Sequence, residues 1–175
     1  MYANWRERMV SFRSTQNRNT AGQGLVEVVG VLVCLLPAVL LLIDFGMIAI
    51  GAGLNDQACR DAARAAASGP PSLLTIADAR AVNSGTPPHD RARAVVRKIY
   101  MTNLPMKVRD NIEAFETIRD VPTDAGGAVD GEVSVKTTID IFPPFVAGAV
   151  VGHNGVTLTC RHSVPITYVV PSKNP

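Results

Sequence analysis

The feature that most constrains the fold of this chain is a long apolar run near its beginning. Residues 28–43 contain no Asp, Glu, Lys or Arg, and Asp44 separates them from a second uncharged run over residues 45–55. As one α-helix, residues 28–47 extend about 30 Å, at ~1.5 Å per residue, which is the thickness of a bilayer core. Helices of small soluble domains rarely stay apolar on every face over that length. The run therefore predicts a transmembrane helix.

The charges that flank the run predict its orientation. The segment before it carries a net charge of +3, whereas the charges that follow it cancel. Because positively charged flanks stay on the cytoplasmic side, we expect the N-terminus inside and residues from about 50 onward outside. These charges are Arg6, Glu7, Arg8, Arg13 and Arg18 before the run, and Asp56, Arg60, Asp61 and Arg64 after it.

The polar segment before the run is typical of a leader or a disordered tail, because it has no amphipathic face. A secretory signal peptide is the competing interpretation. The apolar region of such a peptide covers about 7–15 residues and ends at a small-x-small cleavage site. The run here is longer, and its small residues Ala49, Gly51 and Gly53 lie deep in a continuing helix. The pattern therefore favours a membrane anchor over an ordinary signal peptide.

The entrance of the apolar run carries a family resemblance. Residues 22–27 read GQGLVE, residues 43–46 read IDFG, and residues 62–67 read AARAAA. Together with the apolar helix they resemble TadE-like pilins, the minor pilins or pseudopilins of the tight-adherence branch of type IV pili. The resemblance covers about residues 18–68, and beyond them it depends only on element order and length.

The resemblance implies a processing site and an assembly residue. In type IV pilins, a prepilin peptidase cuts on the cytoplasmic side after a glycine, and the fifth mature residue is Glu. Carried over, the cut falls between Gly22 and Gln23, and Glu27 is the fifth mature residue. Cleavage would create an α-amino group on Gln23 that is mostly cationic at neutral pH. The family implies that this amine and Glu27 neutralise one another as subunits join a filament.

Glu27 and Asp44 each have a simpler alternative. A lone carboxylate at membrane depth costs a few kcal/mol, and pairing reduces that cost, but Glu27 could instead extend to the lipid headgroups. Asp44 lies 17 residues further along, about 25 Å on a helix. That places it near the outer interface, where it would either gain a polar partner in the filament or simply be solvated.

The remaining sequence predicts an α+β head. The long helix, residues 23–68, should end where Gly69 is followed by two prolines. We expect a pilin-like plan of a basic leader (1–22), the hydrophobic helix and a C-terminal head (69–175), which has one or two helices and a short antiparallel sheet. Within the head, the predicted elements are a helix over 87–103 and strands over 111–119, 132–142 and 156–170, the last interrupted at Pro165. The segment 111–119 could instead be helical.

Cysteines and histidines give few predictions. Cys34 lies within the membrane run. Cys59 and Cys160 both fall outside, where a disulfide between them would be worth about 2–4 kcal/mol, and two free thiols are the alternative. Cys160 with His162, and His89 with His153, do not have a recognised metal-ligand spacing. We therefore expect no metal and no cofactor.

Charge is segregated along the head. Residues 80–109 contain seven basic residues and one acidic residue, and residues 110–132 contain the reverse. Two solvated faces explain this pattern, and a contact between the basic face of one subunit and the acidic face of another is the sharper hypothesis. Nucleic-acid binding is disfavoured because only Tyr100 supplies an aromatic ring nearby. The candidate contact residues are Arg91, Arg93, Arg97 and Lys98.

The connection over residues 143–154 is strongly apolar, so we expect it either to fold back onto the core or to form a contact surface.

The sequence contains no nucleophile elbow, phosphate-binding loop or zinc-protease helix, and we expect no enzymatic activity. The resemblance implies a structural subunit of a filament. Its expected partners are the prepilin peptidase that processes it, other pilin subunits and an inner-membrane assembly platform.

As a precursor, the chain would lie in the cytoplasmic membrane with its head periplasmic or extracellular. After cleavage, residues 23–175 are much longer than the major pilins of this branch, which favours a minor or priming subunit for a pilus used in adhesion or export. The rival interpretation is an uncleaved single-pass anchor that carries a binding or scaffold domain.

Overall fold

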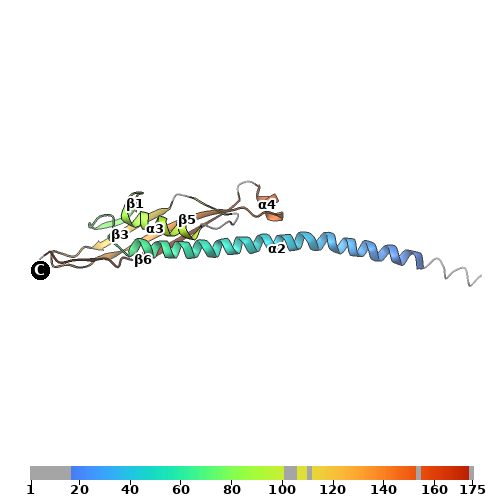
Figure 1. Ribbon diagram of the computed structural model, residues 1–175, viewed down its shortest axis with the longest axis horizontal. Helices are drawn as coiled ribbons and strands as arrows, with labels where there is room; N and C mark the ends of the chain where they lie inside the picture. The colour runs from blue at the N-terminus through green and yellow to red at the C-terminus, as the bar shows by residue number, and fades with distance from the viewer. Residues whose placement is uncertain (1–16, 101–105, 110–111, 153–154, 174–175) are drawn as a thin grey trace, which may run out of the picture. The chain divides into compact units, whose positions relative to one another are not determined.

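The structure is a computed structural model, and it describes residues 17–100, 106–109, 112–152 and 155–173. It divides into two compact units at Asp44, one up to Ile43 and the other from Asp44 to the C-terminus. Helix α2 (Asn17–Ala67) belongs to both units (Figure 1).

Helix α2 agrees with its predicted end and begins earlier than predicted. It ends at Ala67, one residue before the predicted Ser68, and it continues without interruption through Pro37. Residues 17–22 were expected in an unfolded leader but are helical. Helix propagation adds one hydrogen bond for each residue fixed, so a stable apolar helix extends readily into a preceding segment that has no proline.

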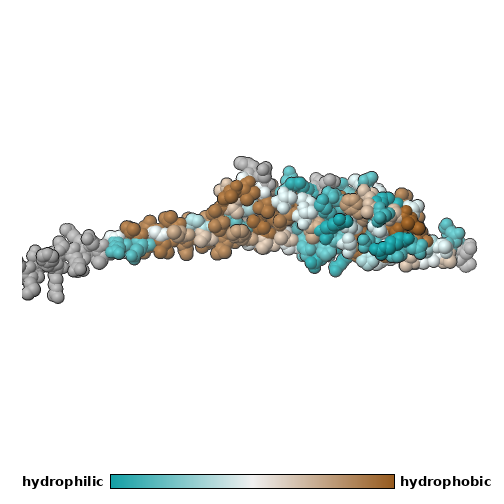
Figure 2. Space-filling model, turned by 180° about the vertical axis from the view of Figure 1, so that it is seen from behind, coloured by the Kyte–Doolittle hydropathy of each residue, from teal (hydrophilic) through white to brown (hydrophobic). Residues whose placement is uncertain are grey.

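In the first unit, the apolar part of α2 is not covered by other described residues. Every residue from 22 to 39 is exposed, and this helix is long and apolar enough to cross a membrane. Figure 2 shows hydrophobic side chains along the helix after a short hydrophilic stretch next to the grey atoms. An apolar surface of this length requires lipid or protein around it.

The second unit is an α+β domain built on an antiparallel sheet. The sheet order is β1-β3-β5-β2, with β6 also paired to β5, and β4 forms a separate small sheet with β7. Figure 1 shows β3, β5 and β6 beside the helices. The strands are β1 (Ala77–Val82), β2 (Met106–Val108), β3 (Glu113–Asp120), β4 (Gly127–Ala128), β5 (Asp130–Ile141), β6 (Val156–Pro165) and β7 (Val169–Val170).

Three predicted strands and the predicted helix are present, and the shortest strands were missed. Strands β3, β5 and β6 confirm the strand predictions, although β6 ends at Pro165, and Val169–Val170 of the predicted strand pair separately with β4. Helix α3 (Pro87–Ile99) begins where predicted, after Thr86. Its predicted last residues, 101–103, lie outside the described residues. Strands β1 and β2 were not predicted, and the apolar connection contains the short helix α4 (Val146–Val151).

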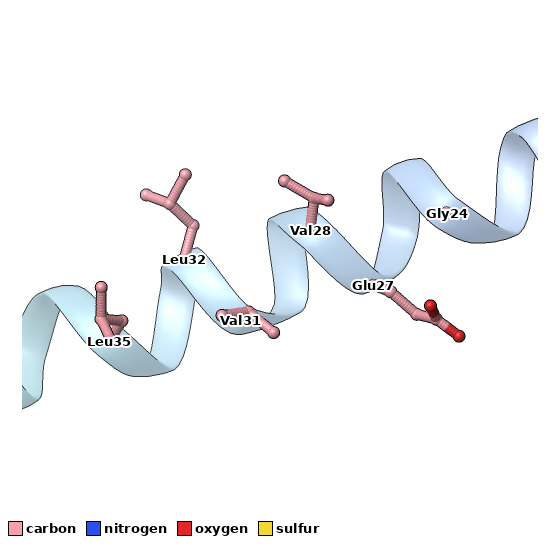
Figure 3. Close-up of a pocket in the computed structure, with 6 residues that line it drawn as sticks. All are labelled: Gly24, Glu27, Val28, Val31, Leu32 and Leu35. Carbon is pink, nitrogen blue, oxygen red and sulfur yellow. The ribbon is translucent and has the colours of Figure 1, made fainter.

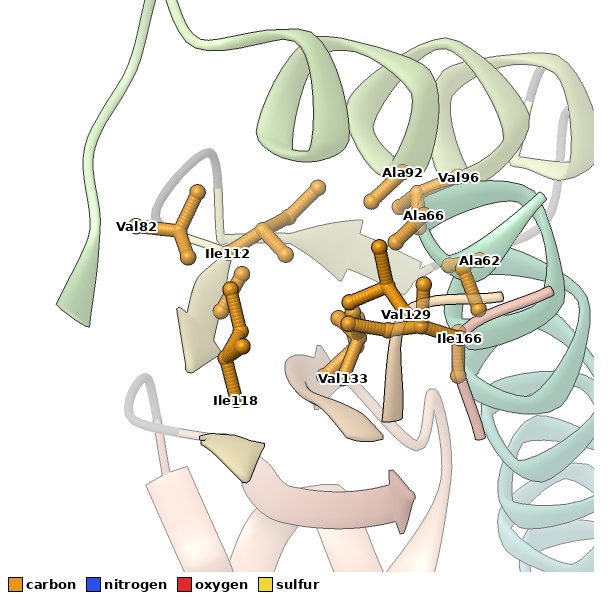
Figure 4. Close-up of a cluster of buried hydrophobic side chains, with 14 residues drawn as sticks. Ala62, Ala66, Val82, Ala92, Val96, Ile112, Ile118, Val129, Val133 and Ile166 are labelled. Atoms are coloured by element: carbon orange, nitrogen blue, oxygen red, sulfur yellow. The ribbon is translucent and has the colours of Figure 1, made fainter. Parts of the chain in front are cut away.

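The core of the domain lies between one face of the sheet and the two longer helices. Ala92 and Val96 of α3 and Ala62 and Ala66 of α2 point into the cluster of Figure 4. Alanine at these α2 positions lets the helix backbone approach the sheet closely. The other core residues are Ala63, Ala67, Val82, Ile112, Ala114, Ile118, Val129, Val133, Val135 and Ile166.

Helix α2 runs antiparallel along β5. The Cys59 thiol donates a hydrogen bond to the Val135 carbonyl at 3.2 Å, and the Thr137 hydroxyl donates to Asn55 Oδ1 at 2.8 Å. One turn before Asn55, a Cβ on Gly51 would lie 2.3 Å from Ile141 Cδ1. These contacts explain why the odd-numbered residues of β5 are buried from Val133 to Ile141, in the phase that the sequence predicts.

Candidate functional site

The predicted processing and assembly residues lie on the exposed first part of α2. Gly22, Gln23 and Glu27 are all helical and exposed. A Cβ on Gly22 would meet nothing within 4 Å. The described part of the chain therefore gives no packing reason for glycine at that position.

Glu27 lies at one end of a shallow apolar hollow on the helix surface. The hollow is formed by Gly24, Glu27, Val28, Val31, Leu32 and Leu35, and Figure 3 shows the Glu27 carboxylate pointing away from Leu32. These residues recur at intervals of three and four along a single helix. That spacing lines one side of a helix and is the pattern by which a second helix packs.

The Glu27 carboxylate has no hydrogen bond or ion pair with the residues that the structure describes. Its neighbours Val26 and Val28 are 69% and 63% exposed, so the apolar surface around it is equally uncovered. An ionised carboxylate in such a setting gains most from a cation supplied by another molecule or chain terminus.

Asp44 has a different environment, because it is fully buried in the second unit. Its Oδ1 accepts a hydrogen bond from the Phe145 backbone N–H at 3.1 Å, and its Oδ2 accepts one from Ala147 N–H at 2.7 Å. Phe145 is the N-cap of α4, and the first N–H groups of a helix lack partners within the helix. Asp44 therefore supplies from α2 the acceptors that the start of α4 needs.

This geometry changes the interpretation of Asp44. The sequence predicted a partner from another subunit or simple solvation, and neither describes the buried carboxylate. The partner is a segment of the same chain, 101 and 103 residues away. Sequence spacing does not reveal it, because the donors are backbone groups that every non-proline residue carries.

Replacing Asp44 with Ala is expected to release α4 locally. Two N–H groups would lose their acceptor, at about 1–3 kcal/mol for each donor left buried without one. Amide hydrogen exchange at residues 145–151 should become at least about thirtyfold faster, with little change in β5. Asp61→Ala is the matched control, because Asp61 is on the same helix and pairs only at the surface with Arg64. Unchanged exchange at α4 in the Asp44 variant would contradict the capping role.

The apolar connection between β5 and β6 presents hydrophobic side chains to the outside. Val150 is 83% exposed, Phe145 42% and Val151 39%. Of the two alternatives for this connection, a contact surface therefore agrees better with the structure than complete burial against the core.

The disulfide predicted between Cys59 and Cys160 is not formed in the structure. Both residues are free thiols. Cys59 donates to the Val135 carbonyl, and the Cys160 thiol points to Asp56 Oδ1 at 3.5 Å. The two thiols are nevertheless close: burial and then the neighbouring Cys59 raise the pKa of Cys160 to about 12. The end of α2 lies beside β6, as the contacts of Asp56 with Cys160 and of Arg60 with His162 show.

Arg91, one of the predicted subunit-contact residues, forms hydrogen bonds within its own chain. Its guanidinium donates to the carbonyls of Ala65 and Ala66 at 2.9 and 2.6 Å and to that of Pro70 at 3.1 Å. These acceptors lie at the end of α2, where carbonyls have no partner within the helix. Arg91 therefore holds α3 to the end of α2, an internal role that the sequence did not predict.

The other candidate contact residues differ in their exposure. Arg97 and Lys98 are exposed on α3 and Arg93 is half-buried, so a role in a subunit contact stays a prediction for these three. The acidic segment is largely neutralised within the chain. Its ion pairs are Glu113 with Lys136, Glu116 with Arg80, Asp124 with Lys173, and both Asp130 and Glu132 with Arg119.

One group of side chains was missed by the sequence. Asp56 of α2 lies beside Cys160 and His162 of β6, with its Oδ1 3.5 Å from the thiol and 3.4 Å from His162 Nε2. Sequence spacing drew attention only to Cys160 and His162, because Asp56 is separated from them by more than 100 residues.

Comparison with known proteins does not add to this geometry. No family model, curated protein or solved structure matches the chain. Function must therefore be inferred from the exposed helix, its one carboxylate near the N-terminus and the α+β domain that follows.

Proposed function

We propose that this chain is a TadE-like pilin subunit of a type IV, tight-adherence pilus. The observation that carries the proposal is Glu27, a carboxylate without a partner among the described residues, on the apolar part of α2 (residues 22–39) that no described residue covers. It follows Gly22 by five residues, at the spacing of the pilin processing site. We infer that cleavage after Gly22 frees the ammonium group of Gln23 and that this group pairs with Glu27 of a neighbouring subunit.

The energetics favour pairing between subunits over an isolated carboxylate. An ionised side chain within the bilayer costs about 2.5–3.5 kcal/mol by insertion scales, and an ammonium partner offsets part of this cost. The apolar hollow beside Glu27 gives an incoming helix a surface to pack on. Ion pairing and helix packing together favour a single axial register between subunits.

In this proposal, the second unit is the exported head from about residue 50 onward, and the bulk of the filament contact is made by α2. The Gly22-Gln23 bond lies six residues inside the helix, which begins at Asn17. A peptidase needs an extended backbone at the bond that it cuts, so the first turns of α2 must unwind during processing. The first turns of an exposed helix open at little cost.

Helix α2 runs without a break through the Gly22-Gln23 bond. This observation favours the second candidate function, an uncleaved single-pass anchor with an extracytoplasmic binding or scaffold domain. If the anchor is not processed, α2 keeps its basic flank, and Glu27 reaches toward the headgroups as a single carboxylate. The exposed apolar residues of α4 would then belong to the binding surface of the domain.

The mature N-terminus separates the two functions. In a cell that has the matching prepilin peptidase, we expect intact-mass measurement and N-terminal sequencing to find a chain that begins at Gln23. Gly22→Leu should keep the leader, whereas Gly30→Leu should be processed, and a Cβ at either position would meet no described residue within 4 Å outside its own helical turn. Recovery of only full-length wild-type chain from such a cell would reject the pilin proposal and support the anchor.

A further inference from the structure

The group formed by Asp56, Cys160 and His162 brings three different metal-ligating side chains together beyond the apolar, membrane-spanning part of α2. Their ligand atoms all lie within 4.8 Å of one another, and all three residues are half-buried. Asp56 comes from α2, and Cys160 and His162 come from β6, two residues apart. Side chains two residues apart point to the same face of a strand, which explains why both reach the helix.

We propose that Asp56, Cys160 and His162 form a binding site for a divalent transition-metal ion, with Zn²⁺ as the ion that this donor set favours. Thiolate, imidazole and carboxylate are the three side-chain ligands of protein zinc sites, and three protein ligands leave the fourth position to water. The site lies in the head and does not depend on whether the chain is a pilin.

The donor spacing agrees with tetrahedral coordination. With bonds of about 2.0–2.3 Å, two donors on a tetrahedral zinc ion lie about 3.3–3.8 Å apart. Asp56 Oδ1 lies 3.5 Å from Cys160 Sγ and 3.4 Å from His162 Nε2. Two of the three donor-to-donor distances therefore lie in the range of a tetrahedral site, and the third is no longer than 4.8 Å.

His162 and Asp56 already bind a cationic side chain, that of Arg60. Arg60 Nε donates to His162 Nε2 at 3.0 Å, and Arg60 Nη2 contacts Asp56 Oδ2 at 2.6 Å. His162 Nε2 therefore acts as an acceptor, which is the form that binds a metal. The Arg60 side chain is 54% exposed, so it can turn into solvent when a metal ion takes its place.

Binding requires one covalent change. The Cys160 thiol gives its proton to the solvent as the bond between Sγ and the metal forms, and no electron transfer takes place. The result is a metal cross-link between α2 and the edge strand β6. It would join the two elements that the predicted disulfide was expected to join, through Cys160 and without Cys59.

Cobalt is the probe of choice, because a thiolate bound to Co²⁺ gives a near-ultraviolet charge-transfer band. The full-length chain with Cys34→Ser, purified in detergent and fully reduced, should bind one Co²⁺ with that band and release it to Zn²⁺. Cys160→Ser should abolish the band, and His162→Ala should weaken binding by at least about tenfold. Arg60→Ala should tighten binding, because it removes the competing cation.

Asp61→Asn is the matched control, because this carboxylate lies on the same helix and pairs with Arg64 instead. It should bind Co²⁺ like the parent chain, and circular dichroism should show that every variant is folded. Zinc should also raise the melting temperature of the parent chain and leave that of Cys160→Ser unchanged. Absence of the band from the reduced parent chain, or its persistence in Cys160→Ser, would overturn the site. Recovery of a metal-free chain with Cys59 and Cys160 joined by a disulfide would do the same.

Discussion

Replacing Glu27 with Gln is expected to abolish incorporation of the chain into filaments while leaving its membrane insertion and its head domain intact. The amide keeps the size of the side chain and removes the charge that pairs with the ammonium group of Gln23. Leaving one buried partner without its counter-ion costs about 3–5 kcal/mol, which weakens association by more than about a hundredfold. The measurement compares the chain in sheared filaments with the chain in the membrane fraction.

The control for Glu27→Gln is the same chemical change at Glu113. That carboxylate is 43% exposed and pairs with Lys136 on the surface of the sheet, so its removal should leave assembly near the wild-type level. Because insertion depends on the apolar run, both variants should reach the membrane in equal amounts. Filaments that contain Glu27→Gln at the wild-type level would show that the charge is not needed for assembly.

The largest effect on stability is expected for Glu116→Ala. Glu116 lies on β3 and its side chain is 0% exposed. Its carboxylate accepts hydrogen bonds from the Ser72 backbone N–H at 3.0 Å, from the Ser72 hydroxyl at 2.5 Å and from Arg80 at 3.3 Å. Removing one partner of a buried ion pair costs about 3–5 kcal/mol, because the remaining donors lose their acceptor.

Chemical denaturation of the full-length chain in detergent, followed by circular dichroism, measures this effect. Glu113→Ala is the matched control, since Glu113 is on the same strand with its carboxylate at the surface, where an ion pair is worth less than about 1 kcal/mol. Similar losses for the two variants would mean that the contacts of Glu116 with Ser72 and Arg80 contribute little. A loss confined to Glu116→Ala would locate much of the stability at the junction between α2 and β1.

Long elements with strong patterns could be predicted from the sequence, and short ones could not. Strand β5 alternates apolar and polar residues over its length, and the odd-numbered side chains from Val133 to Ile141 are buried as expected. Strand β1 has no such pattern: it reads ADARAV, and Ala79 has a φ of 45°. It is a strand because β3 offers it an edge, with Arg80 opposite Glu116 and Val82 opposite Ala114. That edge exists only after the domain has folded.

The candidate site divides in the same way. Gly22 and Glu27 are close in sequence and exposed on one helix. Their spacing alone therefore supports the hypothesis of a processing and assembly site, without tertiary information. Arg91 could not be interpreted from its neighbours. Its position in a basic segment indicated a surface for a partner, whereas its hydrogen bonds to Ala65 and Ala66 give it an internal role.

By itself, the sequence determined that this chain has a helix apolar enough to cross a membrane, where that helix ends and which face of β5 is buried. Each of these properties depends on residues near one another along the chain, through helix or strand periodicity. Only the tertiary structure decided that Asp44 caps α4 and that Asp56 joins Cys160 and His162. Those contacts join residues about 100 positions apart, and their partners include backbone groups that no side-chain pattern identifies.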